Sequence, residues 1–236
     1  MSLIAVIPAR GGSKRIPQKN IRPFCGRPMI SYPLETARQS GLFDLIHVST
    51  EDTVIRDTAA GLGFAPDFPR PVELADDHVG VVPVLGHVAR TYTERGRRFA
   101  GVCLISACAP LLEAADLAAA AKLFYEHGGK KLVLGVTSYP APVEWAFRIS
   151  ADGLLIADNQ ASHATRSQDL QHAYYDSGML AIHPISDFEP GADLKVRPTI
   201  AHILPRHRVV DIDTAEDWEM AETLYLGHQQ RPETHR

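Results

Sequence analysis

Four basic side chains stand close together in one short segment: Arg10, Lys14, Arg15 and Lys19. They surround the pair Gly11-Gly12 and follow directly after the apolar run 3–8. Cations offset the charge of a polyanion, and glycines let backbone N–H groups approach phosphate oxygens closely. The segment has neither the Gly-Lys-Ser/Thr ending of a P-loop nor a G-x-G-x-x-G fingerprint. We therefore predict a triphosphate cradle here, with a solvated basic loop as the alternative interpretation.

A pair of carboxylates forms the second group that could do chemistry. Asp211 and Asp213 are separated by one residue at the end of the apolar segment Val209-Val210. In an extended segment, residues two apart point the same way, so both carboxylates can share one cation. So few oxygen ligands suit Mg²⁺, which usually keeps waters and takes substrate phosphate oxygens. The alternative is that Asp213 or Thr214 caps the next helix, which would leave Asp211 unexplained.

Alternating apolar runs and helical patterns predict the elements that must position these residues. Strands are predicted at 3–8, 45–49, 101–106, 131–137 and 199–204. Helices are predicted at 28–39, 52–62, 81–95, 114–127 and 214–226. This order predicts an α/β fold whose mostly parallel sheet carries helices on both faces. In such a sheet, ligands bind beyond the carboxyl ends of the strands, where the basic segment must lie.

The 236 residues fit one medium-sized domain, which we place at residues 1–226. The strand-helix pattern weakens at 138–180, where short polar segments predict hairpins outside the main sheet. Residues 227–236 are mostly polar and are predicted to form a frayed tail.

Composition argues against several classes of protein. The formal net charge of −4 disfavours a nucleic-acid-binding protein, which would present a broad basic face. No stretch approaches the roughly 20 apolar residues that span a bilayer, so no membrane association is expected. The three cysteines have no metal-ligand spacing and cannot all pair in disulfides, which is typical of a reducing cytoplasm. The eleven histidines show no ligand pattern and receive no role.

Five stretches of the chain carry a resemblance to known enzymes: IPARGGSKRIPQKNI (7–21), FCGRPMI (24–30), RPVELADDHVG (70–80), TRSQDLQHAYYDSG (165–178) and ILPRHRVVDIDTAEDW (203–218). Together they resemble the acylneuraminate cytidylyltransferase family, most closely its pseudaminic acid branch. The resemblance implies a Rossmann-like nucleotidyltransferase fold with a small dimerisation hairpin region, working as a homodimer. It also implies that the anomeric hydroxyl of a nine-carbon ulosonic acid attacks the α-phosphate of CTP, with release of pyrophosphate.

The same resemblance implies a role for individual residues. Nucleotide contacts are expected from Arg10, Gly11, Gly12, Ser13, Lys19, Asn20 and Arg70. Asp211 and Asp213 match the family's Mg²⁺ ligands, and the catalytic candidates are Arg10, Lys19 and Asp211. Asp211 is the candidate acceptor for the proton of the attacking hydroxyl. Sugar contacts are expected from Arg166, Gln168 and Tyr174, because Arg can grip a carboxylate bidentately. For Tyr174, packing of the dimer is the alternative.

Three residues depart from the family pattern. Cys108 stands where a hydroxyl residue is usual, Ser106 replaces a larger Gln or Tyr, and Val81 replaces a Ser or Thr. They leave sialic and legionaminic acids open as alternative sugars, and they leave open a non-catalytic relative that only binds nucleotide. A sugar-nucleotide-dependent glycosyltransferase is a further rival, since such enzymes also hold a metal with an Asp-x-Asp pair. For Cys108 we expect a small packing residue rather than a nucleophile.

Overall fold

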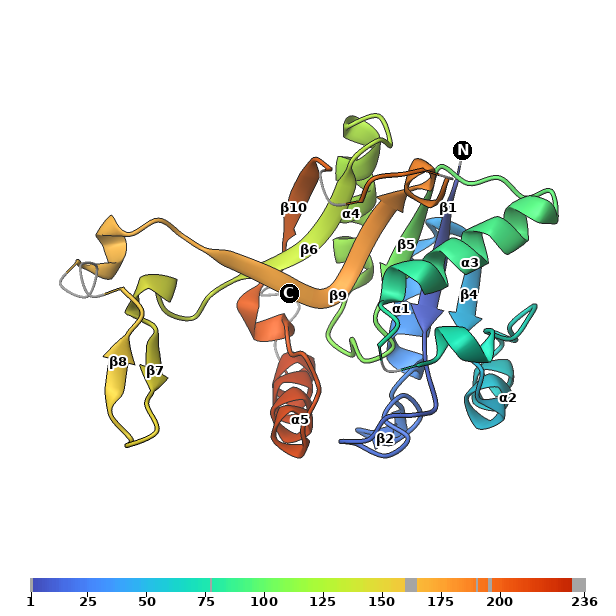
Figure 1. Ribbon diagram of the computed structural model, residues 1–236. Helices are drawn as coiled ribbons and strands as arrows, with labels where there is room; N and C mark the ends of the chain where they lie inside the picture. Colours follow the sequence, from blue (N-terminus) through green and yellow to red (C-terminus); the bar gives the residue numbers. More distant parts are fainter. Residues whose placement is uncertain (1, 77, 160–164, 190, 195–196, 231–236) are drawn as a thin grey trace.

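The computed structural model describes residues 2–76, 78–159, 165–189, 191–194 and 197–230. Its centre is a six-stranded sheet with the strand order β10-β6-β9-β5-β1-β4 (Figure 1). These strands are β1 (Leu3–Pro8), β4 (Phe43–Ser49), β5 (Gly101–Ile105), β6 (Leu132–Ser138), β9 (Tyr174–Pro184) and β10 (Thr199–Ile203). Strands β1, β4, β5, β6 and β10 share one direction, and only β9 runs antiparallel to its neighbours β5 and β6. The predicted α/β fold with a mostly parallel sheet is confirmed.

Helices lie against both faces of this sheet, as predicted (Figure 1). They are α1 (Ser31–Ser40), α2 (Thr53–Gly61), α3 (Val81–Glu94) and α4 (Ala114–Glu126), with α5 (Ala215–Gln229) beside the sheet. Strand β1 shows why both faces need covering helices: its apolar side chains alternate between the two faces of the sheet. Leu3, Ala5 and Ile7 pack in a core with side chains of α1, α2 and α4. Ile4 and Val6 pack in a second core with side chains of α3.

A third apolar cluster lies at one end of the sheet and joins segments far apart in the sequence. It contains Ile16, Phe24, Met29, Tyr32, Cys108, Ile212, Trp218 and Ala221. The Phe24 ring meets the Trp218 ring edge-on, with centroids 5.5 Å apart. Two short strands, β2 (Pro23–Phe24) and β3 (Arg27–Pro28), pair beside it. Because the cluster includes Ile16 and Ile212, it holds the basic segment against the segment of Asp211 and Asp213.

The structure adds β9, a strand that the sequence pattern does not predict. Its first half, Tyr174–Gly178, is polar and partly exposed, so it lacks the apolar run that marks the other strands. Only its second half is fully buried, between β5 and β6. The strand therefore begins inside the stretch 138–180, which was expected to lie outside the main sheet.

Helix α5 also continues beyond its predicted end at residue 226, through Gly227 to Gln229. The imidazole Nε2 of His228 lies 2.8 Å from the Glu113 carboxylate at the start of α4. This contact ties the last turn of α5 to the body of the protein, so the predicted fraying at 227–230 is wrong. The rest of the predicted tail, residues 231–236, lies outside the described residues.

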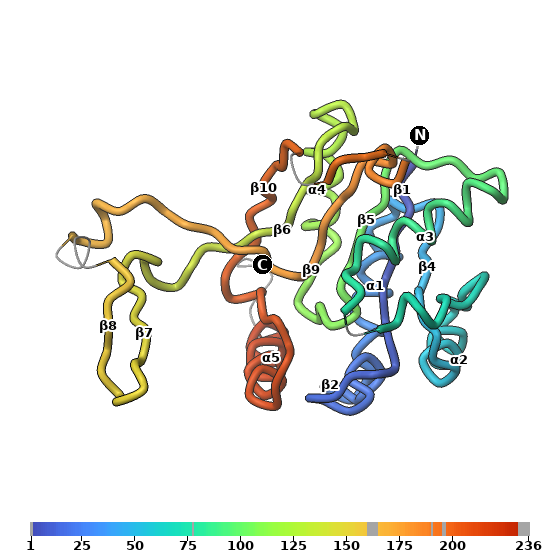
Figure 2. Tube along the Cα trace, in the orientation of Figure 1, coloured from blue at the N-terminus to red at the C-terminus, as the bar shows by residue number. Residues whose placement is uncertain are grey.

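An arm leaves the sheet after β6 and returns at β9, projecting away from the body (Figures 1 and 2). It carries the antiparallel hairpin of β7 (Phe147–Ile149) and β8 (Leu155–Ala157), which turns at Gly153 with φ of 84°. A hairpin outside the main sheet is thus present where one was predicted. Among the described helices, none combines the length and apolar character that crossing a membrane requires.

Candidate nucleotide site

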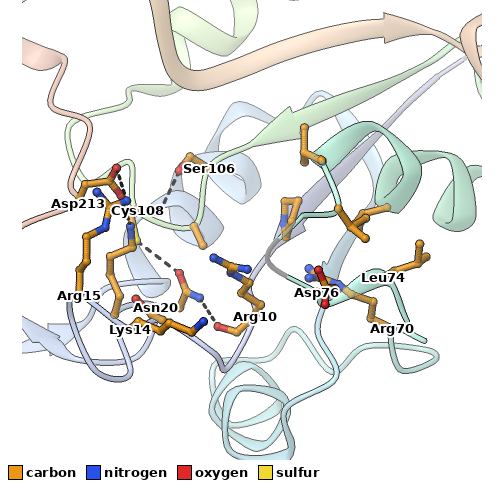
Figure 3. Close-up of a pocket in the computed structure, with 18 of the residues that line it drawn as sticks. Arg10, Lys14, Arg15, Asn20, Arg70, Leu74, Asp76, Ser106, Cys108 and Asp213 are labelled. Atoms are coloured by element: carbon orange, nitrogen blue, oxygen red, sulfur yellow. Dashed lines mark hydrogen bonds and ion pairs between the residues drawn. The ribbon is translucent and has the colours of Figure 1, made fainter. Parts of the chain in front are cut away.

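A cavity of about 560 Å³ opens beyond the carboxyl ends of β1 and β5 (Figure 3). It is lined by Pro8, Arg10, Ser13, Lys14, Arg15, Lys19, Asn20, Arg70, Leu74, Asp76, Val79, Gly80, Val81, Val84, Ser106, Ala107, Cys108, Asp211 and Asp213. The structure therefore brings together all four cations of the basic segment and both carboxylates of the acidic pair. This is the edge of an open α/β sheet at which ligands bind.

The basic segment and the acidic pair are joined by direct contacts. Lys19 Nζ donates to the backbone oxygen of Ile212 at 2.5 Å and lies 3.2 Å from Asp213 Oδ1. Arg15 reaches the other oxygen, with Nη2 at 2.7 Å from Asp213 Oδ2. Both carboxylate oxygens of Asp213 thus face cations within this chain. The Arg15 side chain is 66% exposed, so its ion pair is weak and easily exchanged.

The alternative role of Asp213, as the residue that caps helix α5, is taken by its neighbour Thr214. Thr214 Oγ1 accepts from the backbone N–H of Asp217 at 3.2 Å, and Asp217 Oδ2 accepts back from Thr214 at 2.7 Å. This reciprocal pair is a capping box. Thr214 is therefore the cap of α5, and the Asp213 side chain is left to point toward the cavity.

The acidic pair fits a divalent cation. Partial burial, together with the charge of Asp213, raises the pKa of the Asp211 carboxyl above its ordinary value. A bound cation would relieve the repulsion between these two carboxylates. Among the described residues, no group of three or more His, Cys, Asp and Glu side chains is arranged so that it could hold a metal ion by itself. Two carboxylates alone suit Mg²⁺, which fills its remaining positions with water and phosphate oxygens.

Asn20 lines the cavity and also makes hydrogen bonds within the protein. Its amide Nδ2 donates to the backbone oxygen of Arg10 at 2.9 Å, and its Oδ1 accepts from the Cys108 thiol at 3.4 Å. The thiol and the amide together fix the backbone on which the Arg10 side chain stands. Burial is the main cause that raises the pKa of Cys108, to about 11. Because a nucleophilic cysteine needs the thiolate, this thiol is a packing and hydrogen-bonding residue, as expected.

Arg70 lies at the cavity wall but is almost fully buried. Its Nη2 donates to the Ser49 backbone oxygen at 2.5 Å, its Nε donates to Ser49 Oγ at 3.2 Å, and Nη1 lies 3.7 Å from Glu51. Burial lowers the pKa of this guanidinium, and the Glu51 carboxylate opposes the shift. Arg70 thus joins the end of β4 to the cavity.

The two glycines of the basic segment do not line the cavity. The Gly11 N–H donates to Glu51 Oε1 at 2.8 Å, and a Cβ at Gly11 would collide with the Asp52 carboxylate. Asp52 caps α2 by accepting from the N–H groups of Val54 and Ile55. Gly11 is therefore needed for close approach to the start of α2, and its N–H does not point into the cavity. A Cβ at Gly12 would meet no other atom within 4 Å, so no close approach requires glycine there.

The three residues predicted to contact the sugar lie on the arm or at its base, and none lines the cavity. The Arg166 side chain is 74% exposed and pairs with Asp169 at 3.0 Å. Gln168 belongs to the short turn Ser167–Asp169, and Tyr174 begins β9 with its ring partly exposed. A single copy of the chain does not bring these residues together with the nucleotide cavity.

Sequence reasoning missed two acidic residues of this region, Glu51 and Asp76. Glu51 receives the Gly11 N–H and faces Arg70, and Asp76 lines the cavity. Each is followed by a second acidic residue in the sequence, but residue type and spacing do not show which carboxylate faces the cavity region, so only the fold reveals them. Ser106, Cys108 and Val81, which depart from the family pattern, all line the same cavity.

A mostly parallel sheet that ends in a cavity with clustered cations and an acidic pair is the arrangement expected of a nucleotidyltransferase. Residues 4–141 match the model of the family described as Cytidylyltransferase. The chain belongs to this family of enzymes. It is thereby separated from the sugar-nucleotide-dependent glycosyltransferases that its Asp-x-Asp pair also suggested.

Two curated relatives match along almost the whole chain. The pseudaminic acid cytidylyltransferase of Campylobacter jejuni serotype O:2 is 34% identical over 97% of this chain and 99% of its own length. The CMP-N,N'-diacetyllegionaminic acid synthase of Legionella pneumophila is 27% identical over 98% and 99%. Among solved structures, a CMP:2-keto-3-deoxy-manno-octonic acid synthetase in complex with CTP superposes with a TM-score of 0.70 and 14% identity. It covers 97% of this chain and 100% of that one, which supports the shared fold.

Proposed function

We propose that this enzyme transfers CMP from CTP to the anomeric hydroxyl of a nine-carbon ulosonic acid, with pseudaminic acid as the preferred sugar. The reaction joins the hydroxyl oxygen to the α-phosphorus and releases pyrophosphate. The observation that carries the proposal is the cavity itself, which brings the four cations of the basic segment together with the two carboxylates of the acidic pair at the sheet edge. The choice of sugar is supported by the pseudaminic acid relative, which is 34% identical over nearly its full length.

The residues of the cavity have distinct roles in this proposal. Arg10 and Lys19 neutralise charge on the triphosphate and on the leaving pyrophosphate, so they act electrostatically. Asp211 and Asp213 would hold Mg²⁺, which supplies further charge neutralisation at the phosphates. Asp211, which lines the cavity, is the proposed acceptor for the proton of the attacking hydroxyl. No covalent intermediate is required, in keeping with the unreactive Cys108.

The sugar site in this proposal is completed by a second copy of the chain. One face of the hairpin carries Phe147, Ile149 and Leu155, which are 51%, 75% and 65% exposed. A two-stranded hairpin is only marginally stable alone, and exposed apolar patches of this kind mark interaction sites. The homodimer would cover this face and carry Arg166, Gln168 and Tyr174 to a sugar carboxylate and hydroxyls. The proposed compartment is the cytoplasm, where the three free cysteines stay reduced.

The decisive experiment measures pyrophosphate release from CTP and Mg²⁺ with pseudaminic, legionaminic and sialic acids in parallel. We expect the highest kcat/KM with pseudaminic acid. A higher value with legionaminic or sialic acid would overturn the choice of sugar and leave the reaction in place. Release with none of the three acids would contradict the proposed reaction.

A further inference from the structure

A buried tyrosine hydroxyl joins three elements of the fold at one point. Tyr92 of α3 and His47 of β4 are both buried, and Tyr92 Oη lies 3.0 Å from His47 Nδ1. The same hydroxyl donates to Asp67 Oδ2 at 2.7 Å. Asp67 belongs to the loop 64–71, which runs from α2 to the short helix Val72–Leu74. The hydroxyl of Tyr92 therefore fastens this loop to both the sheet and α3.

The direction of the two hydrogen bonds follows from the number of protons. A tyrosine hydroxyl has one proton and an ionised Asp can only accept, so the Tyr92 proton is given to Asp67. His47 must then carry its proton on Nδ1 and donate to Tyr92 Oη. Its Nε2 is left as a buried acceptor without a hydrogen-bond partner among the described residues. Burial lowers the pKa of His47 to about 4, which keeps the ring in this neutral form.

The loop held by this hydroxyl leads to Arg70, three residues after Asp67. Between them, Phe68 stacks on the His47 ring with centroids 4.5 Å apart and meets the Tyr92 ring at 5.1 Å. Arg70 itself lines the nucleotide cavity, as Figure 3 shows. Because Arg70 also has its own hydrogen bonds to the end of β4, loss of the hydroxyl should loosen the loop without unfolding it.

We propose that Tyr92 is a positioning residue, whose hydroxyl holds the loop 64–71 so that Arg70 is in place when nucleotide arrives. The inference rests on the proposed function, in which CTP occupies this cavity. A loop that is held for only part of the time lowers the apparent affinity in proportion to the held fraction. Bound CTP restores the held state, so the loss should fall on CTP binding and not on turnover at saturation. A role in overall stability alone would not produce this split.

The test is a double-mutant cycle in CTP affinity, measured by calorimetric titration with Mg²⁺ and without sugar. Tyr92→Phe removes the hydroxyl and keeps the ring, whereas Asp67→Ala removes the acceptor. We expect each change to raise the Kd for CTP about 3- to 10-fold, as for one lost hydrogen bond, with kcat close to that of wild type. The double variant should be no weaker than the single variants, because both remove the same contact. Asp67→Asn keeps an acceptor oxygen and should restore the wild-type Kd.

Thr137→Val is the matched control, because it removes another buried hydroxyl, which donates to the Leu204 backbone oxygen at 2.9 Å. Thr137 does not line the cavity, so this variant should lower the melting temperature and leave the Kd for CTP unchanged. Hydrogen exchange without nucleotide gives a measurement that is independent of CTP. The backbone amides of the loop 64–71 should exchange faster in Tyr92→Phe than in wild type or in Thr137→Val.

An unchanged Kd in Tyr92→Phe would overturn the proposal, as would single effects that add up in the double variant. Loop amides that exchange at the wild-type rate, an Asp67→Asn variant as weak as Asp67→Ala, or a wild type without affinity for CTP would do the same. Failure of the proposed function looks different: no acid would yield pyrophosphate, whereas CTP binding and exchange of the loop would still respond to Tyr92→Phe.

Discussion

At the start of α5, two adjacent side chains have separate tasks. Thr214 exchanges hydrogen bonds with Asp217 and so closes the first turn of the helix. Asp213 instead pairs with Lys19 and Arg15 at the cavity. Changes at the two positions should therefore affect different properties of the protein, although they are neighbours in sequence.

We expect Asp213→Asn to lower turnover by about 10²- to 10³-fold, the usual effect of removing an electrostatic transition-state contact. Its melting temperature should stay close to that of wild type, because the cap of α5 is intact. Thr214→Ala is the paired control, with a stability loss of about 1 kcal/mol and normal activity per folded molecule. Steady-state kinetics and thermal unfolding of both variants check this. The reverse pattern would make Asp213 the capping residue.

Residue types and spacing predicted the basic segment and the acidic pair, and the family resemblance added further residues of the cavity wall, among them Asn20 and Arg70. The predicted residues that line it are Arg10, Ser13, Lys19, Asn20, Arg70, Asp211 and Asp213. Gly11 was assigned to phosphate by its type, and only the position of α2 shows that Asp52 excludes a side chain there. Asp76 was given no role, because residue type and spacing do not show that its loop borders the cavity.

Elements α4 and α5 are connected to the acidic pair by a buried ion network. Arg208 Nη1 and Nη2 donate to the two oxygens of Asp116 at 2.5 and 2.9 Å, and both residues are buried. Arg208 also lies 3.0 Å from Glu113, which in turn contacts His228 of α5. Since Arg208 is three residues before Asp211, this network fixes the path of the chain into the cavity.

Arg208→Met should destabilise the protein by about 3–5 kcal/mol, because it leaves the Asp116 carboxylate buried without its partner. The double variant Arg208→Met with Asp116→Leu removes both charges and should recover part of that loss. Lys122→Ala, in the exposed pair Lys122–Glu126, should change stability by no more than about 0.5 kcal/mol. Urea unfolding measures all three. A loss at Arg208 as small as that at Lys122 would show that the network carries little stability.

At the level of elements, the sequence predicted the strands that carry a mainly apolar run and missed β9, whose first half lacks one. Strand β1 is buried on both faces and reads as one apolar run. Strand β9 begins with Tyr174, Tyr175 and Asp176, which are exposed or half-buried where the arm joins the sheet. Its place between β5 and β6 is a property of topology, and no local pattern encodes it.

At the scale of the whole molecule, the arm exposes large apolar side chains that a protein working as a single chain would be expected to bury. Phe147, Ile149 and Leu155 share one face of the hairpin, whereas Arg148 on the other face pairs with Asp158 at 2.8 Å. The other face is mixed, because Ile156, which is 53% exposed, lies directly opposite Arg148. A second copy of the chain is the partner that we propose for the apolar side.

Ile149→Asp should therefore shift the protein from dimer to monomer, because it places a charge in the middle of the apolar face. Val54→Asp is the control, since Val54 is also exposed, at 52%, but lies on α2 in the body of the protein. Light scattering coupled to size-exclusion chromatography measures both masses. A dimer that survives Ile149→Asp, or a wild type that is monomeric, would contradict the proposed role of the hairpin.

The central position of β9 has a consequence for the order in which the chain can fold. Strands β1, β4 and β5 form one half of the sheet, β6 and β10 form the other, and β9 is the bridge between them. During synthesis, β5 and β6 emerge well before β9, so each exposes an unpaired edge until residues 174–184 arrive. Unpaired edges are templates for association with other chains. Completion of the sheet thus depends on a late, sequence-distant pairing, which is intrinsically slow and leaves the nascent protein most exposed to aggregation at that stage.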